Sequence, residues 1–469
     1  MPNSISRRAP RSSYFTTFSD EARAQRIARP IQAFGTIELV LLILLPFGTG
    51  YFLSYYLRTV NAILSTRLTL DLGLNAVELG LITSAYFLVA GISQLPLGWA
   101  LDRFGPQRVQ SACLLLVVLG AILFSGANDV ATLLIARSLM GLGVASALLA
   151  GLKALALACP RDRLGLFNGL IVSIGTAGAI AASAPTEYLL HFIDWRDLFL
   201  VVALTALFSA TAIWWLVPRK LDGTSTGPTG MPTVGYRQIF TDRGFWKLAP
   251  LSATTIGGAW ALQGLWSGPW LRDVMHFDQA SIAGHLLFMA IALCTGALCF
   301  GIILHRLTRL GVTPAHTLSL AVALLIIAEI GLAFAWPVPP LLLWGIVSAF
   351  AAATVLTYTV SAQWFPKESV GRANSAFNLL QFGMAFAVQI LFGHVVSFWP
   401  RDALGHYPAE AYRFAFLGLI AVQALSLLWF ALPHAAGARA DIRPPKPASR
   451  FRHRIPRGLR TQDGCERFR

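Results

Sequence analysis

A guanidinium group and several hydroxyl and amide groups share one face of an apolar stretch near the start of the chain. The polar residues, spaced by four, three and four positions, are Ser54, Arg58, Asn61 and Ser65, with Tyr55 beside them. Residues three or four apart lie on one helix surface. Arginine is always charged and can hold a carboxylate or phosphate with two parallel hydrogen bonds. The stripe therefore predicts an anion site, and an arginine that anchors the helix at the membrane interface is the alternative.

Two further stripes carry polar groups, one together with aromatic residues and one made of amides alone. Segment 244–270 carries Trp260, Gln263, Trp266, Ser267 and Trp270. Segment 371–398 carries Asn374, Asn378, Gln381 and Gln389 on one helical face. We expect Trp260 and Gln263 to contact a ligand and Trp270 to belong to an interfacial aromatic belt. For the amide stripe, hydrogen bonds between helices are the alternative to ligand contact.

Acidic residues are scarce in the apolar stretches. Glu38 and Glu187 fall near the ends of such stretches, and Glu329 falls in the ninth. A site that binds organic cations usually needs a carboxylate. A site that holds Arg58, with Lys153 as a second candidate cation, instead suits an anion or a neutral polar solute.

The composition indicates a membrane protein. Of 469 residues, 55% are hydrophobic and only 13% are charged, and the mean hydropathy is +0.62. A soluble protein carries charge on about a quarter of its residues. The net charge of +15 comes mainly from the two tails, as expected beside anionic headgroups, so nucleic acid is not an expected partner. Five cysteines without a CxxC pair predict small buried side chains rather than a disulfide or metal site.

Twelve apolar stretches approach or exceed the roughly 18 residues that a membrane span needs. They lie at 37–64, 78–101, 109–127, 130–157, 164–190, 197–217, 244–270, 280–304, 314–335, 339–364, 371–398 and 411–432. With a cytoplasmic N-terminus, cytoplasmic segments hold 29 of the 37 lysines and arginines and periplasmic segments hold six. This is the positive-inside pattern. It predicts a multi-pass inner-membrane protein with both termini in the cytoplasm.

A polar linker divides these stretches six and six. The predicted parts are a basic N-tail (1–35), a helical bundle (36–217), a cytoplasmic linker (218–243), a second bundle (244–433) and a basic C-tail (434–469). The linker is rich in Gly, Thr and Pro, as flexible segments are. Repeated halves around a central site are a transporter architecture.

The loop after the second apolar stretch carries a specific motif. It reads Gly98-Trp-Ala-Leu-Asp102-Arg103-Phe-Gly105-Pro-Gln-Arg108 and resembles the loop signature of the major facilitator superfamily, in the matching loop. The resemblance implies that Gly98 lets two helices cross closely. It also implies that Asp102 faces the N-terminus of span eleven, where the helix dipole favours an anion. Arg103 and Arg108 are then expected to bind acidic partners and to hold the cytoplasmic gate.

The fourth stretch contains a second motif of the same family. Arg137-Ser-Leu-Met-Gly141-Leu-Gly143 resembles the superfamily's RxxxGxG signature. A charge at that depth is costly and rarely faces lipid, so the resemblance implies a role in helix packing or coupling. An arginine that extends to the interface is the alternative. The second-half copy of the loop motif has His305 in place of the aspartate, followed by Arg306. Arg306 is expected at the gate, although the clasp between spans eight and five is less well matched.

The resemblance implies an all-α integral membrane fold of twelve transmembrane helices in two pseudo-symmetric six-helix bundles, with spans one, four, seven and ten around a central cavity. The expected function is secondary active transport of a small polar, anionic solute by alternating access. We expect coupling to an ion or proton, in a monomer without cofactor or metal. A drug or metabolite efflux antiporter and a non-transporting sensor or assembly protein are the alternatives. The sequence has no ATP-binding loop or catalytic cluster, so an enzyme is not expected.

Overall fold

The structure, a computed structural model, describes residues 35–160, 163–218, 236–365 and 367–432, and within these residues all regular secondary structure is helical. Ten of the described helical stretches are long and apolar enough to cross a membrane. Two interrupted helical stretches, at 164–189 and 243–273, bring the spans to the twelve that the sequence predicts. Most of the predicted linker and both tails lie outside the described residues, as does Cys465.

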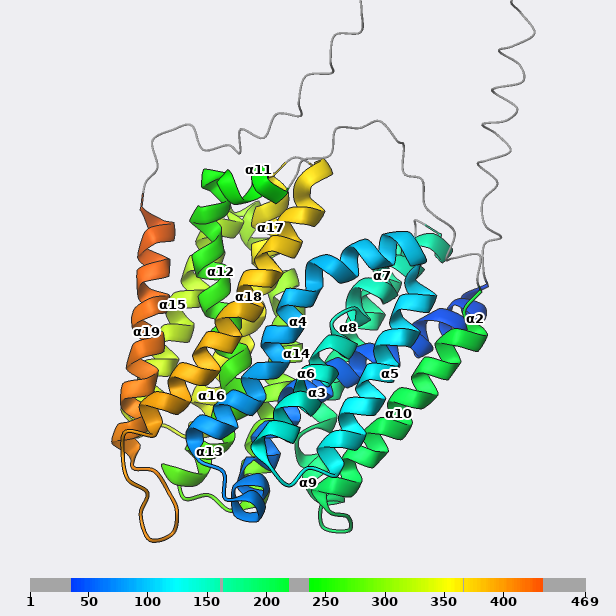
Figure 1. The fold of residues 1–469 in the computed structure, drawn as a ribbon. Helices are drawn as coiled ribbons and strands as arrows, with labels where there is room; N and C mark the ends of the chain where they lie inside the picture. Colours follow the sequence, from blue (N-terminus) through cyan, green and yellow to red (C-terminus); the bar gives the residue numbers. More distant parts are fainter. Residues whose placement is uncertain (1–34, 161–162, 219–235, 366, 433–469) are drawn as a thin grey trace, which may run out of the picture.

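The first half of the chain forms a group of six spans, coloured blue to green in Figure 1. Its elements are α2 (Thr36–Leu39), a π-helical turn (Val40–Leu44), α3 (Leu45–Leu72), α4 (Ala76–Phe104), α5 (Pro106–Ser125), α6 (Val130–Val144), α7 (Ala147–Ala158), α8 (Leu164–Ala181), α9 (Ala184–Leu189) and α10 (Trp195–Leu216). Side-chain hydrogen bonds cap the N-termini of several of these helices. Asn75 accepts a hydrogen bond from the Glu78 N–H at 2.9 Å, and the Glu78 carboxylate accepts one from the Asn75 N–H at 2.8 Å, a capping box that starts α4.

The second half forms the other group, coloured green to orange in Figure 1. Its elements are α11 (Tyr236–Thr241), α12 (Arg243–Ala261), a π-helical turn (Leu262–Trp266), α13 (Ser267–Asp273), α14 (Gln279–Arg309), α15 (Pro314–Ala333), α16 (Pro340–Ala351), a 3-10 turn (Ala352–Thr354), α17 (Val355–Trp364), α18 (Lys367–Val396) and α19 (Ala409–Ala431). The two halves pack together along α4 and α18 and along α8 and α14. A ligand site between the halves would therefore have helices of both groups as walls.

The π-helical turn between α12 and α13 changes which way the later side chains point. A π turn accommodates one residue more than an α turn, so every side chain after it is rotated by about 100° relative to a continuous α-helix. Trp260 precedes the turn, whereas Trp270 follows it. Residues on the two sides of the turn do not continue one helical stripe.

The two ends of the molecule differ in how the halves meet. We call them the Asp102 end, where α4 ends at the top of Figure 1, and the Asp273 end, where α13 lies at the bottom. At the Asp273 end, Arg401 Nη2 donates to the Leu74 carbonyl at 2.8 Å, and the Ala76 N–H donates to the Tyr407 hydroxyl at 3.3 Å. Each of these hydrogen bonds joins one half to the other. They hold the Asp273 end closed in this conformation.

The cysteines only partly follow the expectation of burial. Cys113 and Cys159 are buried, Cys294 is half-buried and Cys299 is exposed. The prediction was wrong for Cys299, because a membrane helix can present a small apolar side chain on its outer surface as readily as to a neighbouring helix.

Candidate functional site

A cavity of about 310 Å³ lies between the two halves. Seven residues that the sequence stripes predicted as ligand contacts line it: Ser54, Tyr55, Arg58, Trp260, Gln263, Asn378 and Gln381. Its volume is at the small end of the range of ligand pockets, roughly 300–1,000 Å³. Helices α3, α4 and α7 supply one wall, and α12, α17 and α18 supply the opposite wall. The cavity thus suits a small solute held by both halves.

Arg58 is the charged group of this cavity. Its side chain is only 6% exposed and lies in the middle of α3, away from either end of that helix. The guanidinium carbon lies 4.3 Å from the ring centre of Trp260, 4.7 Å from that of Tyr55 and 5.9 Å from that of Phe382. None of the described residues that line the cavity is Asp or Glu. The cavity therefore offers an aromatic box around a cation that has no protein carboxylate beside it.

The opposite wall carries a hydrogen-bonded cluster of neutral groups. The Tyr358 hydroxyl donates to Asn378 Oδ1 at 2.7 Å, and Gln381 Nε2 donates to the Ser252 hydroxyl at 2.9 Å. Because the Asn378 oxygen accepts from Tyr358, its NH₂ group remains a donor beside the cavity. Tyr358 was missed by the sequence analysis, although it lies in span ten, which the family resemblance placed at the cavity.

Asn61 and Trp266 do not line the cavity. Asn61 Nδ2 donates to the Thr83 hydroxyl of α4 at 2.8 Å, so this amide joins two helices. Trp266 is buried and stacks on Phe392 with ring centres 4.8 Å apart. Both residues lie on the Asp273 side of the cavity, where α3 and the π turn are packed closely. The expected aromatic-polar stripe ends at Gln263 because the π turn interrupts it.

Trp270 corrects another expectation. It is 2% exposed and packs edge-on against Trp344, with ring centres 5.7 Å apart. It does not belong to an aromatic belt at a membrane interface. The rotation introduced by the π turn directs this side chain into the second half.

Lys153 is not a second cation of the cavity. Its ammonium group donates to the Leu101 carbonyl and to Asp102 Oδ1, both at 2.7 Å. A lysine that lies beside the C-terminus of α4 can hydrogen-bond one of its last carbonyls and compensate the helix dipole. Within the described cavity lining, Arg58 is thus the one cationic side chain.

Comparison with known proteins identifies the family. The family model described as the Major Facilitator Superfamily matches residues 47–388. The chain belongs to the Major Facilitator Superfamily. This superfamily consists of multi-pass membrane transporters, so membership agrees with the family and the fold that the sequence analysis predicted.

Individual relatives match more weakly. "Putative multidrug resistance protein MdtD" of Pectobacterium atrosepticum is 24% identical over 170 residues, 36% of each chain. "Probable sulfoacetate transporter SauU" of Cupriavidus necator is 25% identical over 157 residues, 34% of this chain and 36% of that protein. These alignments thus span about a third of either relative. The crystal structure of a bacterial homologue of the human lysosomal transporter Spinster has the same fold, with a TM-score of 0.67 at 17% identity, over 85% of this chain and 97% of that one.

The superfamily loop signature lies at the Asp102 end. Gly105 has φ +85°, a backbone conformation that favours glycine, and it makes the sharp turn between α4 and α5. The Asp102 side chain is 80% exposed and pairs with Lys153. Arg103 lies over the rings of Trp99 and Phe104, 5.7 Å from each centre, and Arg108 is exposed. In this conformation Asp102 is therefore bonded within its own half.

Two residues of the expected second clasp are not described in detail. The side chains of His305 and Arg306, on α14, are outside what the structure describes, and so are the surroundings of Gly371, on α18 near the start of span eleven. The roles expected of Arg306 at the gate, and of the N-terminus of span eleven as the partner of Asp102, stay predictions.

Arg137 of the second motif lies in the interior of the first half. It is fully buried, donates to the Leu57 carbonyl at 2.9 Å and lies 5.1 Å from the ring centre of Tyr86. An arginine that extends to the interface does not fit this position. A Cβ atom on Gly141 would stand 2.5 Å from the Tyr86 carbonyl oxygen, so only glycine lets α6 approach α4 this closely.

Glycine-to-alanine changes in the two motifs should have different effects on thermal stability. Gly141→Ala forces a methyl group against the backbone of α4, and such overpacking destabilises by about 1–3 kcal/mol. Gly98→Ala is the matched control, because no atom lies within 4 Å of the added Cβ, and alanine favours the helix by roughly 0.5–1 kcal/mol. Thermal unfolding of the purified proteins should show a lower midpoint for Gly141→Ala and an equal or higher one for Gly98→Ala. Equal losses in both would contradict the close approach at Gly141.

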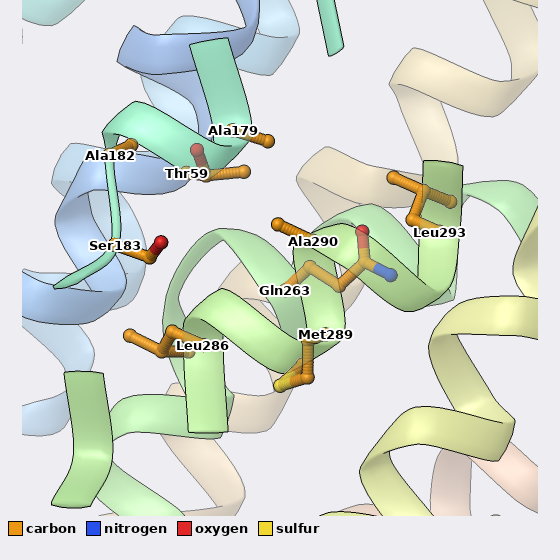
Figure 2. Close-up of a pocket in the computed structure, with 9 residues that line it drawn as sticks. All are labelled: Thr59, Ala179, Ala182, Ser183, Gln263, Leu286, Met289, Ala290 and Leu293. Atoms are coloured by element: carbon orange, nitrogen blue, oxygen red, sulfur yellow. The ribbon is translucent and has the colours of Figure 1, made fainter. Parts of the chain in front are cut away.

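A much smaller pocket adjoins the main cavity on its Asp273 side. Figure 2 shows its lining residues on α3, around the break between α8 and α9, and on α14. It shares Gln263 and Leu293 with the main cavity and measures about 20 Å³. That space suits a single water molecule. We regard it as a hydration site beneath the cavity rather than a second ligand site.

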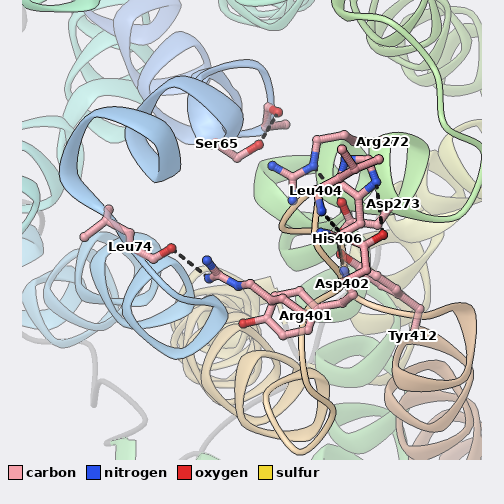
Figure 3. A network of polar contacts seen from close by, with 11 residues as sticks. Ser65, Leu74, Arg272, Asp273, Arg401, Asp402, Leu404, His406 and Tyr412 are labelled. Atoms are coloured by element: carbon pink, nitrogen blue, oxygen red, sulfur yellow. Dashed lines mark hydrogen bonds and ion pairs between the residues drawn. The ribbon is translucent and has the colours of Figure 1, made fainter.

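The closed Asp273 end carries a polar network, shown in Figure 3. The Asp273 carboxylate is 3% exposed and accepts from Arg272 Nε at 2.6 Å, from the Tyr412 hydroxyl at 2.6 Å and from the Tyr407 N–H at 3.3 Å. Asp402 lies in the loop that follows α18. Hydrogen bonds from the backbone N–H of His406, which has the larger effect, and from that of Leu404 lower the pKa of its carboxyl group. The loop that holds Arg401 against Leu74 is thus fixed by hydrogen bonds to two carboxylates.

Proposed function

We propose that this chain transports a small organic anion by alternating access, with Arg58 as the anion-binding residue. The observation that carries the proposal is the guanidinium group of Arg58, a residue only 6% exposed, on a cavity whose described lining contains no carboxylate. A buried charge without a counter-ion is costly, and an anionic ligand would supply that counter-ion. Attraction in a partly desolvated cavity is stronger than at a wet surface.

The rest of the lining fits the carbon skeleton of such an anion. Trp260, Tyr55 and Phe382 surround the guanidinium and offer flat apolar surface. Asn378 offers an amide donor from the opposite half. An anion with a second polar group would engage both halves at once. Sulfoacetate, the solute in the name of one relative, is an anion of this kind because it has both a carboxylate and a sulfonate group.

The conformation supports the alternating-access part of the proposal. The halves are joined by hydrogen bonds at the Asp273 end, whereas Asp102 is exposed at the other end and Gly98 has open space beside it. We propose that in the opposite state the Asp102 end closes and Asp102 exchanges Lys153 for the N-terminus of α18. A ligand that contacts both halves would couple the opening and closing of the two ends to occupancy of the cavity.

In the proposed orientation the Asp102 end faces the cytoplasm and the protein lies in a bacterial inner membrane, because the basic segments lie on that side. Alkaline phosphatase fused at Gly437 should then be inactive. The same enzyme inserted at Gly405, in the loop of the Asp273 end, should be active. Activity at Gly437 would refute the proposed orientation.

A ligand screen tests the proposed substrate class. The purified protein should gain thermal stability with at least one small carboxylate or sulfonate, because a ligand that binds only the folded state stabilises it by mass action. Neutral analogues of the same shape should give smaller shifts. The alternative of a drug efflux antiporter predicts instead that lipophilic cations stabilise the protein and that anions do not. That outcome would overturn the anion proposal.

A further inference from the structure

Three carboxylates are buried among the described residues, and their surroundings differ. Glu187 is 4% exposed and lies 2.7 Å from Arg67 Nη2. Asp273 is 3% exposed and lies 2.6 Å from Arg272 Nε. Glu329, on α15, is fully buried, and its hydrogen-bond partner is the neutral amide of Gln423 on α19. An ionised carboxylate without a cation is the costliest of the three arrangements inside a membrane.

The atoms of this pair indicate a bound proton. Gln423 Nε2 donates to Glu329 Oε1 at 3.3 Å. The second carboxyl oxygen, Glu329 Oε2, and the amide oxygen, Gln423 Oε1, are both buried without a partner. A carboxylic acid has one O–H donor, whereas a carboxylate only accepts. One proton on Oε2 can therefore be donated to Gln423 Oε1, so that acid and amide form a ring of two hydrogen bonds and both unpaired atoms are satisfied.

No other described charge replaces that proton. The helices packed against α15 and α19 around the pair are α12, α14, α16 and α17. The titratable residues with described side chains on these helices and on α19 are Arg243 and Lys247 on α12, His285, Cys294 and Cys299 on α14, Tyr358 on α17, and Glu410, Tyr412 and Arg413 on α19. Arg413 lies ten residues from Gln423, about 15 Å along the helix, over the ring of Phe334. Arg243 and Lys247 lie in the first two turns of α12, about 15 Å or more along that helix from Gly258. None of them forms an ion pair with Glu329 within the described residues.

The pair lies directly behind the wall of the substrate cavity. A Cβ atom on Gly258 of α12 would stand 3.1 Å from Gln423 Nε2. The next two residues of α12, Ala259 and Trp260, line the cavity. One turn before Glu329, Leu325 belongs to a small buried apolar cluster with Ala259 and Ala351. A change in the charge of Glu329 would therefore alter the packing of the helix that holds Trp260 against Arg58.

We propose that Glu329 and Gln423 form a proton-binding site, which is occupied in this conformation and couples proton movement to transport. The bound proton lets α15 and α19 pack against α12. Its loss leaves a buried carboxylate that the pair cannot accommodate, so release requires these helices to separate. The coupling rests on the proposed transport function, whereas the protonation of Glu329 does not.

Infrared spectroscopy of the purified protein tests the protonation directly. At neutral pH the wild type should show the C=O stretching band of a protonated carboxylic acid, and Glu329→Gln should lack this component. Glu410→Gln, which changes an exposed carboxyl in the same pair of helices, is the matched control and should retain it. An unchanged band in Glu329→Gln would overturn the site. So would a Glu329→Gln protein that fails to fold, because glutamine imitates the neutral acid.

Proteoliposomes test the coupling, with radiolabelled sulfoacetate as the probe. Counterflow exchange needs no net proton movement, so Glu329→Gln should keep it, whereas accumulation driven by a pH gradient should fall by roughly tenfold or more. Wild-type accumulation in Glu329→Gln would refute the coupling and leave the transport function intact. An absence of wild-type counterflow with sulfoacetate and with every other carboxylate and sulfonate tried would instead refute the proposed function, and the infrared result would still decide the proton site.

Discussion

Replacing Arg58 by alanine is expected to lower kcat/KM for anion transport by about a hundredfold or more, because truncating one partner of a buried charge pair costs roughly 2–5 kcal/mol. Arg58→Lys keeps the charge but loses the planar fork and its stacking on Trp260 and Tyr55. We expect this variant to lose about tenfold. Initial rates of uptake into proteoliposomes measure both changes.

Trp260→Ala is the matched comparison for Arg58. It removes an aromatic wall of the same cavity but no charge. Its effect should therefore be similar for an anion and for a neutral analogue of the same shape, whereas the Arg58 variants should discriminate between the two. Near-normal anion transport by both Arg58 variants would leave the guanidinium without a role in binding.

Replacing Asp273 by asparagine is expected to give the largest loss of stability. The carboxylate receives three hydrogen bonds, and the Arg272 side chain, 16% exposed, would lose its ion pair. Breaking a buried ion pair by removing one partner costs about 3–5 kcal/mol. The midpoint of thermal unfolding should fall by several degrees, since 1 kcal/mol shifts it by roughly 2–4 °C in a chain of 150–250 residues and by less in a longer one.

Asp402→Asn serves as the control for Asp273. Asp402 is exposed in the loop of the same end, and asparagine keeps an oxygen that can accept from the N–H groups of Leu404 and His406. Its unfolding midpoint should stay close to that of the wild type. If Asp273→Asn were as stable as Asp402→Asn, the network in Figure 3 would not be what holds the Asp273 end together.

The spans were predictable because they depend on length and apolar content alone. The expected stretch 130–157 corresponds to helices over Val130–Ala158, and 411–432 corresponds to Ala409–Ala431. The first span was expected to end at residue 64 but continues to Leu72. Its last turns carry Arg67 and Asp71, which form ion pairs at the Asp273 end, so polar residues extend this helix beyond its apolar part.

The candidate site was predictable where one helix face stays regular. Ser54, Tyr55 and Arg58 lie on the cavity because α3 is unbroken there. Trp266 and Trp270 were misplaced because a π turn cannot be recognised from the spacing of residues. Lys153 was misplaced because its partner, the C-terminus of α4, comes from a distant part of the chain. The pairing of Glu329 with Gln423 likewise depends on which helices become neighbours.

The central claim is that this chain carries small organic anions through the cavity at Arg58. Counterflow in proteoliposomes tests it most directly. Vesicles loaded with unlabelled carboxylates or sulfonates, sulfoacetate among them, should take up the labelled form of at least one of these anions. This uptake should be lost in Arg58→Ala and retained in Glu410→Gln, which changes an exposed carboxyl of α19, when both are reconstituted in the same amount. Exchange of lipophilic cations alone, or anion exchange that persists unchanged in Arg58→Ala, would contradict the account.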